Sequence, residues 1–176
     1  MGIFDRFKRN PESAAAASPP DPASDIRATT TADRPDFSLS LPFRWEAVSC
    51  EEGYDFRNCF LPEQIIVTVL RHNHELAAEE LENAITFLVS RRRSAVGQLS
   101  SSNAILGETI LTRGNGQVEA RVIGEDAQNK IRLAFVIRGT AKKTVTVALT
   151  RYMLKEIGTP FIVYANVIFD LLKIKE

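Results

Sequence analysis

Apolar and polar residues alternate along much of the chain after residue 36, and this alternation predicts antiparallel strands. It appears first in "FSLSLP" (37–42) and returns in four successive segments, at 105–112, 117–124, 130–139 and 143–152. The sequences between these four segments are polar and contain Gly, and Asn115-Gly116 can supply the positive φ angles of a tight hairpin. We therefore expect the four segments to form a meander of neighbouring strands.

A different pattern precedes the meander. The run "IIVTVL" (65–70) is too continuously apolar for a strand with one wet face, so it predicts a central strand covered on both faces. A second extended piece follows a turn at Pro42 and carries Trp45, which we expect to be a partly buried core residue.

Two segments have helical periodicity. The first is predicted over 75–93, with an apolar stripe, acidic residues in its first half and "RRR" (91–93) at its end. Its stripe residues are Ala77, Leu81, Ala84, Ile85, Leu88 and Val89. The second helix has Thr159 as N-cap and Pro160 at its first position. Its expected stripe is Phe161, Ala165, Ile168, Leu171 and Leu172, although Ile162, Val163 and Val167 leave a strand open as the alternative.

These elements predict an α+β domain over 36–176, with an antiparallel sheet of about six to seven strands and two helices packed on it. The helices either sandwich the sheet or share one of its faces. A chain of 176 residues has room for one such domain and a leader.

The predicted leader has two parts. Residues 11–35 hold five of the eight prolines and Ile26 as their only large apolar side chain, which is typical of a disordered linker. In residues 1–10, the side chains of Ile3, Phe4 and Phe7 would share one side of a short helix. That segment is either a site of partner docking or peripheral membrane contact, or a frayed start too short to be helical alone.

Charge and cysteine content narrow the function classes. Lys plus Arg and Asp plus Glu number 22 each and are scattered, so nucleic acid is not an expected partner. The charged first residues cannot form the apolar core of an export signal, so we expect a cytoplasmic protein. Cys50 and Cys59 match no common zinc spacing and are expected to be reduced thiols, with a bridge as the alternative.

The sequence "RHNHE" contains the only candidate metal ligands with a suggestive spacing. His72 and His74 would point the same way on a strand, where two imidazoles can chelate a metal. They lie where a strand ends and a helix begins, however, so we expect them to be solvated turn residues rather than metal ligands. We find no phosphate-binding Gly-rich loop and no nucleophile motif, and we expect no cofactor.

The opening "FSLSLPFRWEA", with Phe37, Pro42 and Trp45, resembles the entry of the PsbP-like fold, which DcrB-like proteins share. The order of the later elements is similar to a bacterial branch of that group, the effector-associated chaperones of type VI secretion. The resemblance covers about residues 36–174. It implies action by binding and transfers no catalytic residue.

We therefore expect a non-enzymatic binding module, most concretely a cytoplasmic chaperone or adaptor that shields apolar segments of a secreted effector or another protein partner. This requires that the helices leave part of the sheet uncovered. The alternative is a small metal- or thiol-dependent enzyme that uses His72, His74 and a cysteine. The sequence also leaves a homodimer open.

Overall fold

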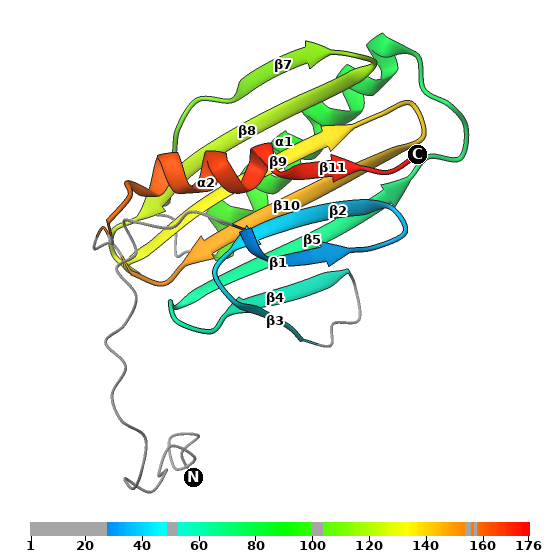
Figure 1. The fold of residues 1–176 in the computed structure, drawn as a ribbon. Helices are drawn as coiled ribbons and strands as arrows, with labels where there is room; N and C mark the ends of the chain where they lie inside the picture. Colours follow the sequence, from blue (N-terminus) through cyan, green and yellow to red (C-terminus); the bar gives the residue numbers. More distant parts are fainter. Residues whose placement is uncertain (1–27, 49–52, 100–103, 154–155, 157) are drawn as a thin grey trace, which may run out of the picture.

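The computed structural model describes residues 28–48, 53–99, 104–153, 156 and 158–176, and it confirms an α+β fold with two helices (Figure 1). The N-terminal elements are β1 (Ala28–Asp33), β2 (Phe37–Pro42), β3 (Trp45–Val48), β4 (Tyr54–Asn58), β5 (Glu63–Arg71) and α1 (Ala78–Leu99). The C-terminal elements are β6 (Ala104–Leu106), β7 (Ile110–Gly114), β8 (Gln117–Asp126), β9 (Ile131–Gly139), β10 (Lys143–Arg151), α2 (Phe161–Asp170) and β11 (Leu172–Ile174).

The strands form two sheets rather than the single sheet of six to seven strands that we expected. The large sheet has the order β3-β4-β5-β10-β9-β8-β6, with β7 also paired to β8, and the small sheet has the order β1-β2-β11. All pairs are antiparallel. The chain passes from the small sheet to the large one at Phe43, whose φ of 66° lies in the left-handed region.

The predicted meander is confirmed, and it contains the tight hairpin. Asn115 and Gly116 have φ angles of 51° and 71°, as a two-residue turn between β7 and β8 requires. The first strand of the meander is interrupted: β6 pairs Leu106 with Gly124, whereas β7 pairs Ile110 with Arg121. Between these two pairs the chain advances four residues from Leu106 to Ile110, whereas β8 advances three residues from Arg121 to Gly124. The β6–β7 side therefore has one extra residue, as in a β-bulge.

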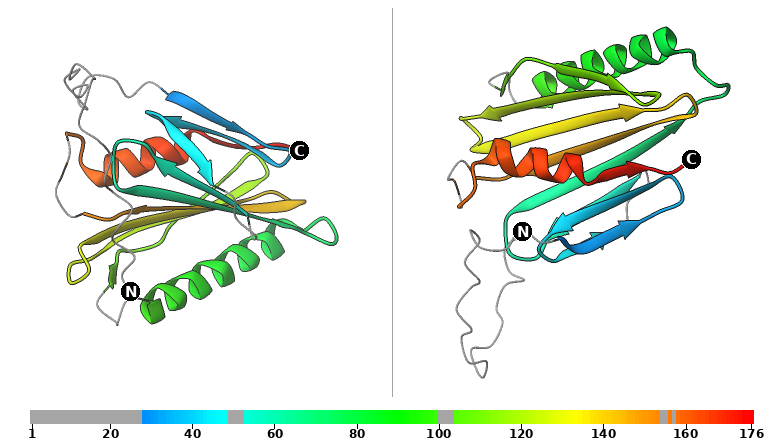
Figure 2. Two further views of the ribbon diagram at one scale, coloured as in Figure 1. Left: turned by 90° about the horizontal axis from the view of Figure 1, so that it is seen from below. Right: turned by 45° about the horizontal axis from the view of Figure 1, so that its top comes forward.

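One face of the large sheet is fully covered. The small sheet and α2 lie together on it, as the left view of Figure 2 shows, and enclose the larger of two apolar cores. Alternate side chains of β2, Phe37, Leu39 and Leu41, have no exposed surface and face Val145, Val147 and Leu149 of the same core.

The opposite face of the large sheet is covered only in part. Helix α1 packs there on β8 and β9, with Leu81, Ile85 and Val89 buried against Phe135 and Ile137. A helix is about 10 Å wide and strands are about 4.8 Å apart, so one helix covers roughly two strands. The two helices thus sandwich the sheet, and among the described residues no helix covers β10, β5, β4 and β3 on this side.

The expectation that 65–70 would be covered on both faces is therefore wrong. On β5, Ile65 and Val67 have no exposed surface, but Ile66 and Thr68 on the α1 side are half-buried, and Leu70 is 53% exposed. A run of β-branched residues reports strand propensity as well as burial, which is why it looked like a doubly covered strand.

Three predicted boundaries also need correction. Helix α1 runs through Arg91–Arg93 to Leu99, so the basic residues do not mark its end. Helix α2 ends at Asp170, and Leu172 is buried in β11 instead of extending the helical stripe. The first residue of α2 is Phe161 and its N-cap is Pro160, so Thr159 is not the N-cap. The Phe161 backbone N–H donates a hydrogen bond to the Glu156 carboxylate over 3.0 Å.

The predicted linker is too long, because 28–33 form β1. The segment "ATTTAD" lacks large apolar residues, but its Thr30 hydroxyl donates to the Phe43 carbonyl (3.0 Å) and accepts from the Trp45 backbone N–H (3.2 Å). Polar contacts, which composition does not reveal, hold this strand. Residues 1–10 and 11–27 lie outside the described residues.

We predict that Gly53→Ala destabilises the fold by about 2 kcal/mol or more, because Gly53 has a φ of 111° and an added Cβ would lie 2.4 Å from the Val67 carbonyl oxygen. Urea unfolding followed by circular dichroism measures the loss. As a control, Gly114→Ala should stay within about 0.5 kcal/mol of the wild type, because nothing lies within 4 Å of its added Cβ. Equal stabilities of the two variants would contradict the prediction.

Candidate binding groove

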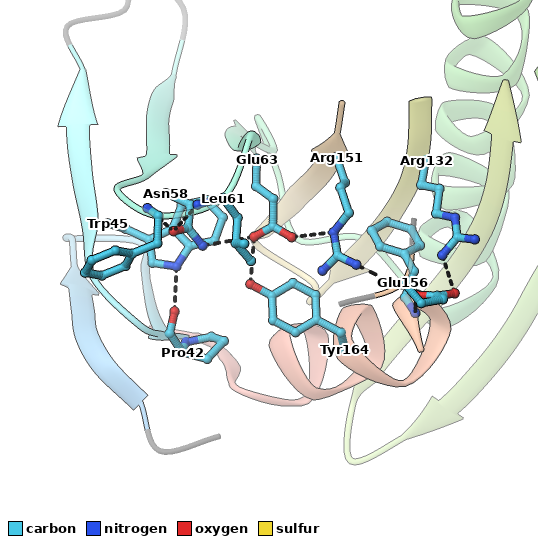
Figure 3. A network of polar contacts seen from close by, with 11 residues as sticks. Pro42, Trp45, Asn58, Leu61, Glu63, Arg132, Arg151, Glu156 and Tyr164 are labelled. Atoms are coloured by element: carbon cyan, nitrogen blue, oxygen red, sulfur yellow. Dashed lines mark hydrogen bonds and ion pairs between the residues drawn. The ribbon is translucent and has the colours of Figure 1, made fainter. Parts of the chain in front are cut away.

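A cluster of buried polar groups lies where one end of β5 pairs with β10 (Figure 3). Arg151 Nε donates to Glu63 Oε1 over 2.6 Å, and the two side chains are 2% and 0% exposed. The Tyr164 hydroxyl (2.9 Å) and Asn58 Nδ2 (3.0 Å) both donate to the other oxygen of Glu63. Strands β4, β5 and β10 and helix α2 are joined by this one carboxylate.

Aromatic rings complete the surroundings of Arg151. Its guanidinium carbon lies 5.1 Å from the centre of the Phe161 ring and 4.9 Å from that of Tyr164, distances at which a cation is attracted to a ring face. Burial, followed by the charge of Glu63, raises the pKa of Tyr164 well above its usual range, so its hydroxyl remains a donor.

A second ionic cluster lies at the other end of β5 and β10. Arg71 Nη2 lies 2.7 Å and Lys143 Nζ 3.0 Å from the carboxylate oxygens of Asp36, which is itself buried. Hydrogen bonds from Arg71 and then Lys143 hold the pKa of Asp36 below its ordinary value. The charged groups of each cluster pair with one another, and we interpret the two clusters as structural features that lie at the two ends of the large core.

The open half of the large sheet presents a different kind of site, a groove between α1 and the floor of β5, β10 and β9. It consists of two adjoining hollows of about 650 and 240 Å³ that share Arg92 and Ala95. We name it the α1 groove. The residues that line it include Ile66 and Thr68 of β5, Leu133, Phe135 and Ile137 of β9, Thr146, Ala148 and Thr150 of β10, and Leu88, Arg91, Arg92, Ala95 and Val96 of α1.

The floor of the α1 groove is formed by aliphatic residues, by Phe135 and by threonines. Ile66, Thr146 and Ala148 are each half-buried, and the aromatic ring of Tyr152 stands at one end with 51% of its residue surface exposed. The groove is therefore accessible along its length, and a ligand that entered it would bury apolar surface now in contact with water.

Arg92 is the charged residue of the groove without a partner. Within the described residues its half-buried guanidinium makes no hydrogen bond or ion pair, and burial alone lowers its pKa. Its neighbours differ: Arg93 donates to the Gly107 carbonyl over 2.8 Å, and Arg91 lies 5.9 Å from the centre of the Phe87 ring. A half-buried cation without a counter-charge is less favourable than a fully solvated one, so this position favours an anionic ligand group.

The acidic residue of the groove does not balance Arg92. Asp126 accepts hydrogen bonds from the Asn129 backbone N–H (3.0 Å) and the Asn129 side chain (2.8 Å). The backbone bond is the main cause that lowers the pKa of Asp126. The Asp126 carboxylate therefore stabilises the turn that follows β8, and its oxygens are hydrogen-bonded within that turn rather than to Arg92.

The structure separates the residues of the suspected metal site. The ring nitrogens of His72 lie 3.0 Å from the Ala141 carbonyl oxygen and 3.0 Å from the Thr144 hydroxyl, whereas His74 is exposed. Cys59 is an exposed thiol, and Cys50 lies outside the described residues. Among the described residues, no group of three or more His, Cys, Asp or Glu side chains is placed to hold a metal ion.

The other singled-out residues have mixed outcomes. Ile3, Phe4 and Phe7 lie outside the described residues. Trp45 is a core residue, as expected: it is buried, and its ring N–H donates to the Pro42 carbonyl over 2.7 Å.

Sequence reasoning missed both the buried ion pair and the groove, although a signal existed for each. Glu63 is in phase with Ile65 and Val67, so strand alternation alone places it on the buried face. Arg92 is seven residues after Ile85 and thus lies on the apolar stripe of the predicted helix. We interpreted it only as part of the cationic end of that helix.

Comparisons with known proteins identify no family for this α+β, two-sheet chain. No protein-family model and no curated protein matches it. A crystal structure of a protein from Bacteroides thetaiotaomicron VPI-5482 is similar over 80% of the chain, with 13% identity and a TM-score of 0.43, and the chain spans 45% of that protein's length. Similarity at this level identifies neither a family nor a function. In the described part of the chain, no helix is long and apolar enough to cross a membrane.

We predict that Glu63→Gln destabilises the protein by about 3–5 kcal/mol, because it leaves the buried Arg151 guanidinium with only the more distant Glu156 carboxylate, 3.9 Å away, as a counter-charge. Urea unfolding measures this loss. The double variant Glu63→Met/Arg151→Met removes both charges and should recover part of the stability, because the Tyr164 hydroxyl and the Asn58 amide still lose their acceptor. A Glu63→Gln protein as stable as the wild type would show that the pair does not hold this end of the core.

A pH prediction follows from Asp36. Its pKa in the folded protein is below the ordinary value of 3.8, so its contribution to stability is complete above about pH 5 and is lost as the pH falls through the folded pKa. We expect the difference in unfolding free energy between the wild type and Asp36→Asn to be constant from about pH 5 to 7 and to shrink below about pH 4. A difference that did not change at low pH would contradict this assignment.

Proposed function

We propose that this protein is a non-enzymatic binding module, a cytoplasmic chaperone or adaptor that holds an apolar segment of a protein partner in the α1 groove. The observation that carries the proposal is the half-covered face of the large sheet. A binding module needs accessible apolar surface bounded by polar groups, and the groove combines the two.

The size of the groove suits a protein segment. Hollows of about 650 and 240 Å³ that adjoin each other can take several side chains in a row, and alternate residues of β5 and β10, strands of nine residues each, contribute to the floor. Leu70, 53% exposed, lies on β5 on the same side of the sheet as Ile66 and Thr68. A partner segment that covered these side chains would gain the free energy of apolar burial.

The resemblance of the 36–174 region to the PsbP-like fold supports the same class of function. In the bacterial branch of effector-associated chaperones it implies a secreted effector as the partner. The proposal therefore names a secreted protein with apolar segments first and other protein partners second.

The test uses a substitution that fills the groove. Ala95 is half-buried and lines both hollows, so Ala95→Trp places an indole ring where the partner would lie. We expect tagged wild-type protein, isolated from its native cells and washed with salt, to retain one dominant partner. Ala95→Trp should retain at least tenfold less of it, as expected when a central contact of an interface is lost.

The control is Ser94→Trp, which adds the same ring at the preceding, exposed position of α1. It should retain the partner at the wild-type amount. Equal capture by Ala95→Trp and the wild type would remove the α1 groove as the binding site, and wild-type protein without any specific partner would contradict the binding module itself.

A further inference from the structure

We infer that the α1 groove receives an amphipathic helix of the partner, laid beside α1 on β10 and β5, with a carboxylate of that helix paired to Arg92. This inference rests on the proposed function and names the form and charge of the bound segment. It is supported by the spacing of the fold, by the composition of the groove floor and by the charge of its wall.

The spacing of the elements matches a second helix. Packed helices lie about 8–10 Å apart, and two strand spacings amount to about the same distance. Since α1 lies over β8 and β9, the next helix position on this face is over β10 and β5, where the floor of the groove is. Helix α1 has 22 residues and is about 33 Å long, so it can flank a bound helix of several turns.

The floor residues at this position are compatible with a closely packed helix. Thr68, Thr146, Ala148 and Thr150 are small, so a helix can approach the sheet, and Ile66 adds aliphatic surface below it. A helix also leaves its outer face in water, which suits a groove that is open along one side. A small amphiphile in a well-formed pocket is instead buried over most of its surface.

The arginine side chains on the α1 side of the groove favour a ligand with a negative charge. Arg92 has no hydrogen bond or ion pair within the described residues, and the nearby Asp126 is occupied by Asn129. Arg91, exposed on the same helix, adds a second positive charge to this wall. An Asp or Glu on the bound helix would supply two acceptor oxygens to the planar guanidinium, a strong and directional contact.

The experiment selects ligands from a displayed library of random 18-residue peptides with helix-favouring composition, in which Glu, Gln and Lys are equally allowed at each polar position. Selection against the wild type is compared with selection against Arg92→Gln and Ala95→Trp. The control is Arg44→Gln, which removes the same charge from a side chain that is 72% exposed and does not line the groove. We expect peptides with an apolar stripe and one recurrent acidic position to be enriched by the wild type and by Arg44→Gln.

Synthetic peptides from this selection then test the ion pair directly. Replacing the recurrent Glu of the peptide by Gln should weaken binding to the wild type roughly tenfold, whereas the same replacement should have little effect on binding to Arg92→Gln. Circular dichroism of the complex should show helix in the bound peptide.

The outcomes separate this inference from the proposed function. Peptides that need the groove but show no acidic position, no coupling to Arg92 or no helix on binding would overturn the inference and leave the binding module intact. A fatty acid found at one copy per chain in the wild type and absent from Ala95→Trp would also overturn it. If no peptide distinguished the wild type from Ala95→Trp, both proposals would fail.

Discussion

The fold depends most on the buried ion pair between Glu63 and Arg151, because it sets how β5 and β10 pair. The two residues are direct partners at one end of the ladder, and Arg71 and Lys143 are partners at the other end, where they share Asp36. A buried pair adds little net stability compared with apolar residues, but a one-residue shift of either strand would turn its charge to the opposite face and leave the other charge buried alone. The pair therefore specifies which side chains of β5 and β10 face the core and which face α1.

That register also defines the α1 groove. With Glu63, Ile65 and Val67 directed into the large core, Ile66 and Thr68 must face the other side of the sheet. Because α1 is wide enough for only two strands, these side chains remain accessible. The groove thus results from two independent constraints, the pairing of charges at the strand ends and the difference in width between one helix and the large sheet.

Much of this architecture could be predicted from local sequence. The meander followed from alternation and from the Asn115-Gly116 turn, and both helices followed from their apolar stripes. The separation into two sheets could not be predicted, because alternation tells which face of a strand is buried but not which strands pair. The crossing between sheets depends on a left-handed Phe43, a conformation that residues of its kind seldom adopt. The position of Arg92 on the apolar stripe of α1 indicated a charge at this helix face, but the groove itself could not be predicted, since it depends on which strands α1 covers and not on any motif.

The fully buried Arg151 and the half-buried Arg92 differ in the groups that surround their charges. Arg151 has a carboxylate at 2.6 Å and two aromatic rings around it, so its charge is balanced within the fold. Arg92 lies on the apolar stripe of α1 at the wall of an accessible groove, and the described residues offer it no counter-charge. An apolar residue at this position would pack more favourably in the free protein. The guanidinium becomes favourable when a ligand brings a negative charge, and this is the physical reason to connect Arg92 with binding.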